Sequence, residues 1–317
     1  MQRFLNALKA VAEPTRLRLL ALLAHGELTV SELVRILRQS QPRISRHLKL
    51  LAEAGLVERL QEGAWAFYRL ADRSMEGTLA RRLVAMLEAG EPGELARDRK
   101  RLDDVKAERQ AAADAYFRAN AADWDRIRAL YVPEREVEAA LLAATEGEAT
   151  DELLDVGTGT GRMLELFAPS IRYGIGVDMN REMLAIARAR LDRAGHHHCH
   201  VRLGDMYALG LPAGAFDIVI FHQVLHFADN PPLALAEAAR VLKAGGSLLI
   251  ADFAPHQLEY LRTEHAHRRL GFGEAEMARW CEAAGLDATV AARLPGEALS
   301  VILWKARKPA DAARRAA

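Results

Sequence analysis

Apolar residues in the first part of the chain recur every three or four positions, which is typical of amphipathic helices. The run from Phe4 to Val11 predicts a first helix. Pro14 then stands at a position where a second helix can begin, and this helix is expected to continue to about Ala24. The chain therefore opens with two helices in succession.

Two further helices and a hairpin follow. Thr29 and Glu32 have the spacing of a capping box and predict the start of a third helix. A fourth helix is expected to begin after Ser40. Short β-type runs at 56–60 and 65–70 predict a hairpin, which completes the pattern of a winged helix-turn-helix.

The fourth helix has one apolar and one cationic side. Ile44, Leu48 and Leu51 share a stripe, and between Arg35 and Lys49 there are five Lys or Arg residues but no Asp or Glu. The second helix of a helix-turn-helix enters the major groove, and cationic side chains release counterions from the phosphates. We predict DNA contacts from Ser40, Gln41, Arg43, Ser45, Arg46, His47 and Lys49.

From about residue 151 onward, short apolar runs alternate with helical segments, which predicts a parallel, doubly wound α/β sheet. The expected strands are 153–156, 174–177, 199–203, 216–221 and 247–251. The expected organisation is a DNA-binding domain over 1–90, a helical linker over 91–118, a Rossmann-like domain over 119–307 and a disordered tail over 308–317.

Composition supports two domains with different partners. The 317 residues have a net charge of +0, but residues 1–90 carry 14 Lys and Arg against 9 Asp and Glu, whereas the rest carries 29 against 34. A basic surplus in one domain suits a polyanion partner for that domain. No stretch reaches the roughly 18 apolar residues of a membrane helix, and the N-terminus lacks a secretory core. With only Cys199 and Cys281, the chain is expected in the reducing cytoplasm.

A glycine-rich turn follows the first strand of the second domain, in the order Asp155-Val156-Gly157-Thr158-Gly159-Thr160-Gly161. Glycines let the backbone approach a ligand closely. The G-x-G-x-G spacing differs from the G-x-G-x-x-G of NAD-binding domains. Asp178 ends the second strand, where its carboxylate can accept hydrogen bonds from two ribose hydroxyls. Asp205 follows the end of the third strand.

The first seventy residues resemble the ArsR-type repressors in the stretches AEPTRLRLLALL, ELTVSEL, SQPRISRHLKLLAEAGLV and WAFYRL. This resemblance implies a homodimer that binds a palindromic operator and responds to an effector. The metal-sensing branch carries ELCVCDL, but here Thr29 and Ser31 occupy the two thiol positions. Hydroxyls are poor soft-metal ligands, so no metal site is expected there.

Residues 115–306 resemble the class I S-adenosylmethionine-dependent methyltransferases in the glycine turn, GIGVD, GDM, FDIVI-FHQVLHF and LKAGG. The resemblance implies that the glycine turn holds the methionine moiety, Asp178 the ribose and Asp205 the adenine amino group of S-adenosylmethionine or S-adenosylhomocysteine. It also implies a lid helix that contains Trp124 and Tyr131; packing of these two aromatic residues in the core is the alternative interpretation. The expected cofactor residues are Asp155, Gly157, Thr158, Gly159, Gly161, Asp178, Met179, Gly204, Asp205, Met206, His222 and Tyr131.

Catalysis is left open by the sequence, because methyl transfer needs alignment of the reactants and requires a base only for acidic substrates. His226, His256 and His265 are candidate catalytic residues, and each can equally be structural; Glu264, His265 and His267 are expected on one helix. The run His196–His200 is interpreted as a polar strand start rather than a metal site. The leading hypothesis is a regulator whose operator binding depends on the adenosyl ligand, and the alternative is an active small-molecule methyltransferase with an autoregulatory DNA-binding domain. DNA methylation ranks below both, because HQVLHF replaces the motif of amino-methylating DNA enzymes.

Overall fold

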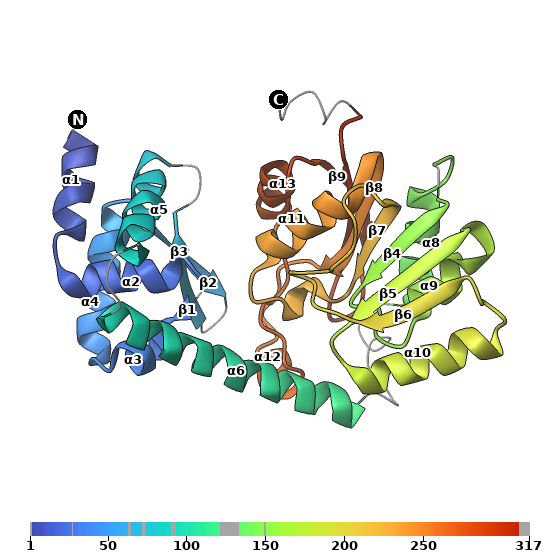
Figure 1. Ribbon diagram of the computed structural model, residues 1–317, viewed down its shortest axis with the longest axis horizontal. Helices are drawn as coiled ribbons and strands as arrows, with labels where there is room; N and C mark the ends of the chain where they lie inside the picture. Colours follow the sequence, from blue (N-terminus) through green and yellow to red (C-terminus); the bar gives the residue numbers. More distant parts are fainter. Residues whose placement is uncertain are drawn as a thin grey trace. The chain divides into compact units, whose positions relative to one another are not determined.

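The computed structural model describes residues 2–26, 28–62, 65–71, 74–89, 93–120, 133–148 and 150–310. The chain divides into two compact units, Met1–Ala112 and Ala113–Ala317 (Figure 1). No helix in these described ranges is long and apolar enough to cross a membrane.

The N-terminal unit is a bundle of helices with a small antiparallel sheet. Its elements are α1 (Gln2–Val11), α2 (Pro14–Leu23), β1 (Leu28–Thr29), α3 (Val30–Leu37), α4 (Gln41–Glu53), β2 (Val57–Glu62), β3 (Trp65–Leu70), α5 (Met75–Glu88) and the first part of α6 (Glu94–Asn120). The three strands are arranged in the order β1-β3-β2. This order confirms the predicted winged helix-turn-helix, and β1 is an addition that the sequence did not indicate.

Local capping explains where the third and fourth helices begin. The Thr29 hydroxyl accepts from the Glu32 N–H at 3.3 Å, and the Glu32 carboxylate accepts from the Thr29 N–H at 2.8 Å. The capping box predicted for α3 is therefore present. Arg38, at φ 54°, ends α3 in the left-handed conformation and turns the chain toward Ser40, the residue before α4.

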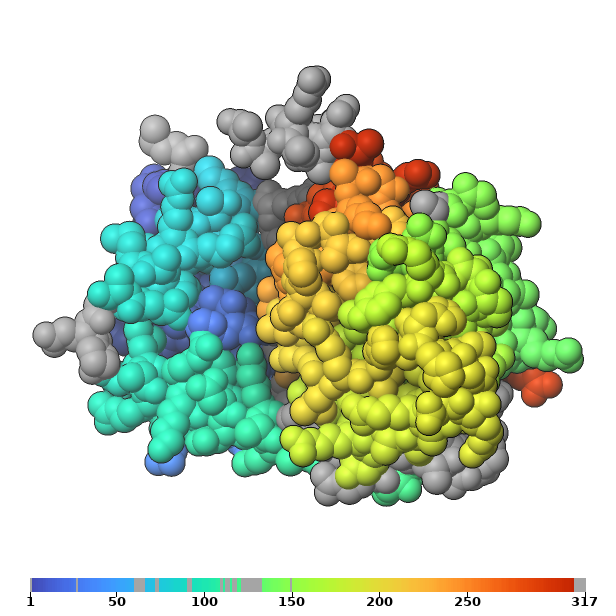
Figure 2. Space-filling view, turned by 45° about the vertical axis from the view of Figure 1, so that its right-hand side comes forward, coloured from blue at the N-terminus to red at the C-terminus, as the bar shows by residue number. Residues whose placement is uncertain are grey.

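The first part of α6 belongs to the core of the N-terminal unit. Leu102 and Val105 are buried in the same apolar cluster as residues of α2 to α5. Asp98, also buried, accepts two hydrogen bonds from the Arg18 guanidinium at 2.6 and 2.8 Å. The expected linker is thus helical, and its beginning also packs onto the N-terminal unit, where α5 and α6 form part of the surface (Figure 2). The domain boundaries at 90, 118 and 307 stay predictions.

The C-terminal unit contains a seven-stranded sheet in the order β6-β5-β4-β7-β8-β10-β9. Its strands are β4 (Glu152–Val156), β5 (Tyr173–Asp178), β6 (Cys199–Leu203), β7 (Phe216–His222), β8 (Leu242–Phe253), β9 (Asp287–Leu294) and β10 (Val301–Arg307). The strands from β6 to β8 in this order all pair in parallel, which confirms the predicted doubly wound α/β sheet.

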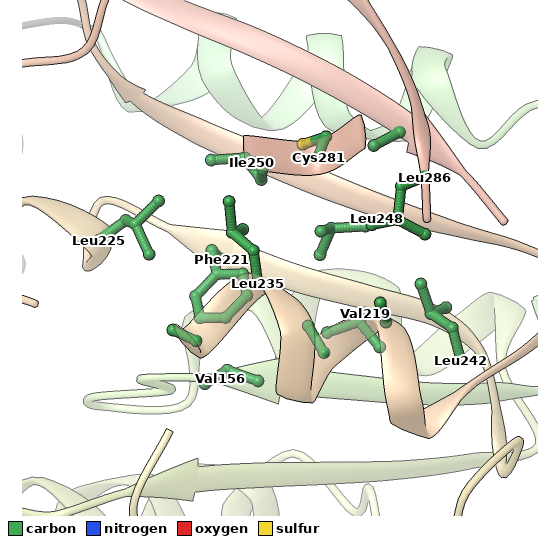
Figure 3. Packing of buried hydrophobic residues seen from close by; sticks show 14 of the residues in the cluster. Val156, Val219, Phe221, Leu225, Leu235, Leu242, Leu248, Ile250, Cys281 and Leu286 are labelled. Carbon is green, nitrogen blue, oxygen red and sulfur yellow. The ribbon is translucent and has the colours of Figure 1, made fainter. Parts of the chain in front are cut away.

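Alternate residues of the central strands enter two apolar layers, one on each face of the sheet. Leu153, for example, lies in one cluster and Leu154 in the other. The helices that cover one face are α8 (Glu134–Ala144), α9 (Arg162–Phe167) and α10 (Arg181–Arg193), and those on the other are α11 (Pro231–Val241) and α13 (Glu274–Ala283). Figure 3 shows Phe221 of β7 and Ile250 of β8 packed near Leu235 of α11. The result is a three-layer sandwich.

The sheet differs from the expectation at one edge. β9 and β10 form a hairpin, and β10 pairs antiparallel with β8 from Val301 opposite Phe253 to Arg307 opposite Ser247. A hairpin reverses the chain, so its two strands cannot both be parallel to their neighbours. β8 also begins at Leu242, earlier than the predicted residue 247.

The Arg18–Asp98 pair allows a test of how firmly α6 is attached. We expect Asp98→Asn to lower the free energy of unfolding of the N-terminal unit by about 3 kcal/mol, because the substitution removes the buried carboxylate from the poorly solvated Arg18 guanidinium and leaves it only the exposed Glu94 carboxylate at 3.5 Å. Urea unfolding of the full chain, with hydrogen exchange at α2 and α6 amides, measures the loss and assigns it to this unit.

Asp103→Asn is the matched control for this prediction. Asp103 forms an exposed pair with Arg99 at 3.4 Å on the same helix. Exposed pairs contribute little, so a change below about 0.5 kcal/mol is expected. Equal losses in the two variants would contradict the anchoring role of Asp98.

Candidate functional site

The glycine turn after β4 folds back onto the neighbouring strand β5. The N–H groups of Gly157 and Thr158 donate to the Val177 carbonyl at 2.7 and 3.1 Å. The φ angles are 72° at Gly157, 53° at Gly159 and 82° at Gly161. These values lie in the left-handed region, which favours glycine. The turn leads directly into α9.

Asp178, the last residue of β5, joins three strand ends. Its Oδ2 accepts from the Gly159 N–H at 2.8 Å, and its Oδ1 accepts from the Asn180 N–H at 2.8 Å. Its backbone carbonyl accepts from the Gly204 N–H, which follows β6, at 3.0 Å. The structure therefore brings together the glycine turn, Asp178 and Gly204, as the sequence predicts for the carboxyl ends of parallel strands.

Asp155 lies beneath the turn, and Val224 lies against it. The buried Asp155 carboxylate accepts from the Thr158 hydroxyl at 2.6 Å, which holds the shape of the turn from within β4. A Cβ added at Gly157 would lie 2.3 Å from Val224 Cγ2, in the loop that follows β7. Gly157 thus allows the turn and this loop to approach each other.

Asp205 and the residues after it form a compact turn that follows β6. Asp205 Oδ1 accepts from the Tyr207 N–H at 2.9 Å, Met206 is partly buried, and Met179 is 47% exposed. The Tyr207 hydroxyl accepts from the Asn230 N–H at 3.0 Å. Burial raises the pKa of Tyr207 to about 12, so its hydroxyl stays protonated.

His222 ends β7 and is buried. Its Nε2 lies 3.6 Å from Glu134 Oε1 at the start of α8. Trp124 and Tyr131 lie outside the described residues.

His226 lies in a short 3-10 helix, Leu225–Phe227, and pairs with a residue that the sequence analysis missed. Its Nδ1 is 2.7 Å from Oδ1 of Asp252, near the end of β8, and both residues are buried. The sequence did contain a signal for this pair, because Asp252 directly follows the apolar run 247–251. A carboxylate buried on a central strand needs hydrogen-bond donors, so a partner for Asp252 could have been sought.

The other two candidates lie on the segment after β8. His256 is partly buried, and burial lowers its pKa to about 4; its Nδ1 accepts from the Leu258 N–H at 3.3 Å. His265 directly follows α12 (Tyr260–Glu264). The expectation that Glu264, His265 and His267 share one helix is wrong, because α12 ends at Glu264 and Ala266 has φ 57°.

The basic side of α4 is accessible. Arg43, Arg46 and Lys49 are exposed, whereas Ile44 and Leu48 are buried, as predicted. The remaining predicted contacts are also on or next to α4, where Ser40 and Gln41 are exposed and Ser45 and His47 are half-buried. An anionic backbone can therefore reach the three cations.

Glu13, the residue that caps α2, lies beside α4. It is 4.0 Å from Arg43 and 3.7 Å from His47, and it accepts from the Arg16 N–H at 2.9 Å. Burial lowers the pKa of His47, and the nearby cations of Arg43 and Arg46 lower it further, whereas the carboxylate of Glu13 raises it. His47 therefore favours its neutral form.

The histidine-rich run at 196–200 borders the sheet. Cys199 begins β6 and is buried, His200 is exposed, and His198 Nε2 lies 3.0 Å from the Ala168 carbonyl. Among the described residues, no group of three or more His, Cys, Asp or Glu side chains is placed to hold a metal ion.

Each of the two units matches a known protein family. Residues 13–59 match the bacterial regulatory protein family of ArsR type, and residues 154–250 match a methyltransferase domain. An uncharacterised helix-turn-helix transcriptional regulator of Methanocaldococcus jannaschii is 45% identical over 65 residues, which cover 20% of this chain and 73% of that protein.

Methyltransferase relatives match the C-terminal unit. A malonyl-[acyl-carrier protein] O-methyltransferase of Serratia marcescens is 34% identical over 153 residues, 48% of this chain and 56% of that enzyme. An uncharacterised methyltransferase of Bacillus subtilis is 31% identical over 116 residues, 36% of this chain and 46% of that protein. The chain therefore spans about half the length of these relatives.

Solved structures agree with this fold. The match to the crystal structure of a Bacillus subtilis protein covers 55% of this chain and 99% of that chain, with a TM-score of 0.50 and 20% identity. The match to a putative Haloferax volcanii methyltransferase, solved in complex with a methyltransferase activator, covers 61% of this chain and 97% of that chain, with a TM-score of 0.51 and 22% identity. By its N-terminal unit the chain belongs to the ArsR family of helix-turn-helix regulators, and its C-terminal unit is a class I methyltransferase domain.

Proposed function

We propose that this chain is a DNA-binding transcriptional regulator whose operator affinity depends on S-adenosylmethionine or S-adenosylhomocysteine bound in the C-terminal unit. The observation that carries the proposal is the union, in one chain, of an exposed cationic α4 and a unit in which a glycine turn, Asp178 and Asp205 follow neighbouring strand ends. Genes of methionine or one-carbon metabolism are the targets that such an effector suggests.

The described residues fit an adenosyl ligand. The left-handed glycine turn leaves backbone without Cβ atoms beside the ligand, which suits the methionine moiety. The Asp178 carboxylate accepts from the Gly159 and Asn180 N–H groups at the end of β5, and we assign the ribose hydroxyls to this carboxylate. Asp205 is the acceptor for the adenine amino group. When bound, S-adenosylmethionine would supply an electrophilic methyl group.

Regulation requires that the ligand distinguish two states of the protein. A ligand shifts an equilibrium only by its difference in affinity for those states. S-adenosylmethionine and S-adenosylhomocysteine differ by a methyl group and a positive charge, which offers a physical basis for such a distinction.

The DNA-binding form is proposed to be a homodimer in the cytoplasm. Apolar side chains on α1 are exposed at Phe4, Leu5 and Leu8, and Met86 of α5 is 74% exposed. Apolar surface of this kind is expected to be covered by a second copy. A dimer also matches the two-fold symmetry of a palindromic operator.

A second candidate function is methyl transfer to a small molecule. The specific observation in its favour is the buried pair of His226 and Asp252, because a histidine oriented by a carboxylate is suited to accept a proton. The relatives from Serratia marcescens and Tropheryma whipplei are named as O-methyltransferase and demethylmenaquinone methyltransferase, respectively, and both act on small or carrier-bound compounds.

The regulatory proposal is tested on DNA selected from a random pool with the full chain. Saturating S-adenosylhomocysteine is expected to change the dissociation constant for this duplex by at least about 5-fold, since allosteric couplings are typically 1–3 kcal/mol. Fluorescence anisotropy measures binding. An unchanged constant, with ligand uptake shown by calorimetry, rejects the regulatory proposal.

The adenosyl site is tested by Asp178→Ala. We expect the affinity for S-adenosylhomocysteine to fall about 10- to 100-fold, because hydrogen bonds to a charged group contribute about 1.5–3 kcal/mol. Isothermal titration calorimetry measures the change, and DNA binding without ligand should persist. Asp192→Ala, an exposed carboxylate on α10, is the control. A normal affinity in Asp178→Ala argues against the assigned ribose position.

The DNA interface is tested by Arg46→Ala on α4. Removal of a phosphate contact weakens binding to all sequences and reduces the slope of log K against log salt by about 1. Binding is measured over a series of salt concentrations. Lys100→Ala removes an exposed cation from α6 and should leave the slope unchanged. The same slope in wild type and Arg46→Ala would remove Arg46 from the interface.

A further inference from the structure

The His226–Asp252 pair lies at the carboxyl edge of the central strands, in the loop that also borders the glycine turn. His226 follows Val224 by two residues, and Val224 is the side chain that a Cβ at Gly157 would meet. Asp252 lies near the carboxyl end of β8. The pair is therefore anchored in the same part of the unit as the proposed adenosyl site.

Asp252 determines which nitrogen of His226 carries a proton. Asp252 is fully buried, and its oxygens accept from the backbone N–H groups of His226 at 3.2 Å and Phe253 at 2.8 Å. Its Oδ1 is also 2.7 Å from His226 Nδ1. A carboxylate can only accept, so Nδ1 must donate, and in the neutral ring Nε2 is then the basic nitrogen.

Aromatic rings surround the His226 ring. The rings of Phe227 and His267 lie 4.1 Å from the His226 ring between centroids, and Phe253 lies at 5.0 Å. Burial lowers the pKa of His267, with a smaller contribution from His226. His267 and His256 are therefore neutral. Asp252 is the carboxylate in direct contact with the His226 ring.

We infer that His226 Nε2 accepts the proton of the methyl acceptor, that Asp252 is its positioning residue, and that the acceptor is a small aromatic compound with a phenolic hydroxyl. This inference rests on the methyltransferase activity proposed above. A carboxylic acid is already ionised and needs no base, whereas an aliphatic alcohol is a much weaker acid than a phenol. A phenol, with a pKa of about 10, lies within reach of a histidine base, and its ring suits the aromatic surroundings.

The step balances without a further reactant. The hydroxyl proton moves to Nε2, the phenol oxygen forms its bond to the methyl carbon, and the electron pair of the broken carbon–sulfur bond remains on sulfur. The positive charge of the sulfonium is thereby replaced by that of the imidazolium. Asp252 stabilises this imidazolium, and the proton then passes to water.

The test compares two phenols that differ in acidity. Purified full chain, loaded with labelled S-adenosylmethionine, is assayed at mildly alkaline pH with 4-methylphenol, which is protonated, and 4-nitrophenol, which is largely ionised. For His226→Gln we expect about a 100-fold or greater loss on 4-methylphenol, in line with general-base contributions, and a much smaller loss on 4-nitrophenol. A purely structural role would reduce both rates equally.

A second readout does not depend on turnover. ¹⁵N NMR of histidine-labelled protein should show His226 protonated at Nδ1 in the wild type, and this preference should be lost in Asp252→Asn. His197→Gln, an exposed histidine of the same unit, is the matched control for rate and spectrum. Thermal unfolding and calorimetry with S-adenosylhomocysteine show that each variant is folded and retains the adenosyl site.

The outcomes separate the two proposals. Failure of the wild type to bind S-adenosylhomocysteine rejects the adenosyl site itself, and the proton-transfer role with it. Normal binding with no methylation of either phenol overturns the acceptor class. Equal losses on the two phenols in His226→Gln, or an unchanged tautomer in Asp252→Asn, overturn the roles of His226 and Asp252 while the adenosyl site stands.

Discussion

Backbone hydrogen bonds between successive strand ends hold the candidate site of the C-terminal unit together. The glycine turn donates to the Val177 carbonyl and to the Asp178 carboxylate, and the chain after β6 donates to the Asp178 carbonyl. Parallel pairing aligns the carboxyl ends of β4, β5 and β6, so one residue at the end of β5 contacts both neighbours. The positions of Gly157 and Asp205 are therefore consequences of the sheet, and a ligand that uses all three strand ends needs little rearrangement of the backbone.

Features with a local cause were predictable from the sequence. The capping box of Thr29, the basic side of α4 and the glycine turn each depend on residues a few positions apart, and the structure contains all three. Asp178 and Gly204 are distant in sequence, but the alternation of strands and helices was sufficient to place them together. The roles assigned to the individual site residues stay predictions.

Features that depend on tertiary packing were missed. The pairing of β10 with β8 and the contact between His226 and Asp252 join segments whose proximity is decided by strand order. The attachment of α6 through Asp98 was equally hidden, because a buried carboxylate and an exposed one look alike in a charged helix. In each case the missing information was the identity of the partner rather than the type of residue.

The regulatory and catalytic proposals need not exclude each other. Methyl transfer converts S-adenosylmethionine into S-adenosylhomocysteine within the same site, so an enzyme that turns over changes the charge of its own ligand. If operator affinity differs between the two ligands, the supply of a phenolic acceptor would decide which of them occupies the site. Operator binding would then follow the availability of the acceptor as well as that of the cofactor, because a linked equilibrium responds to every process that changes the bound species.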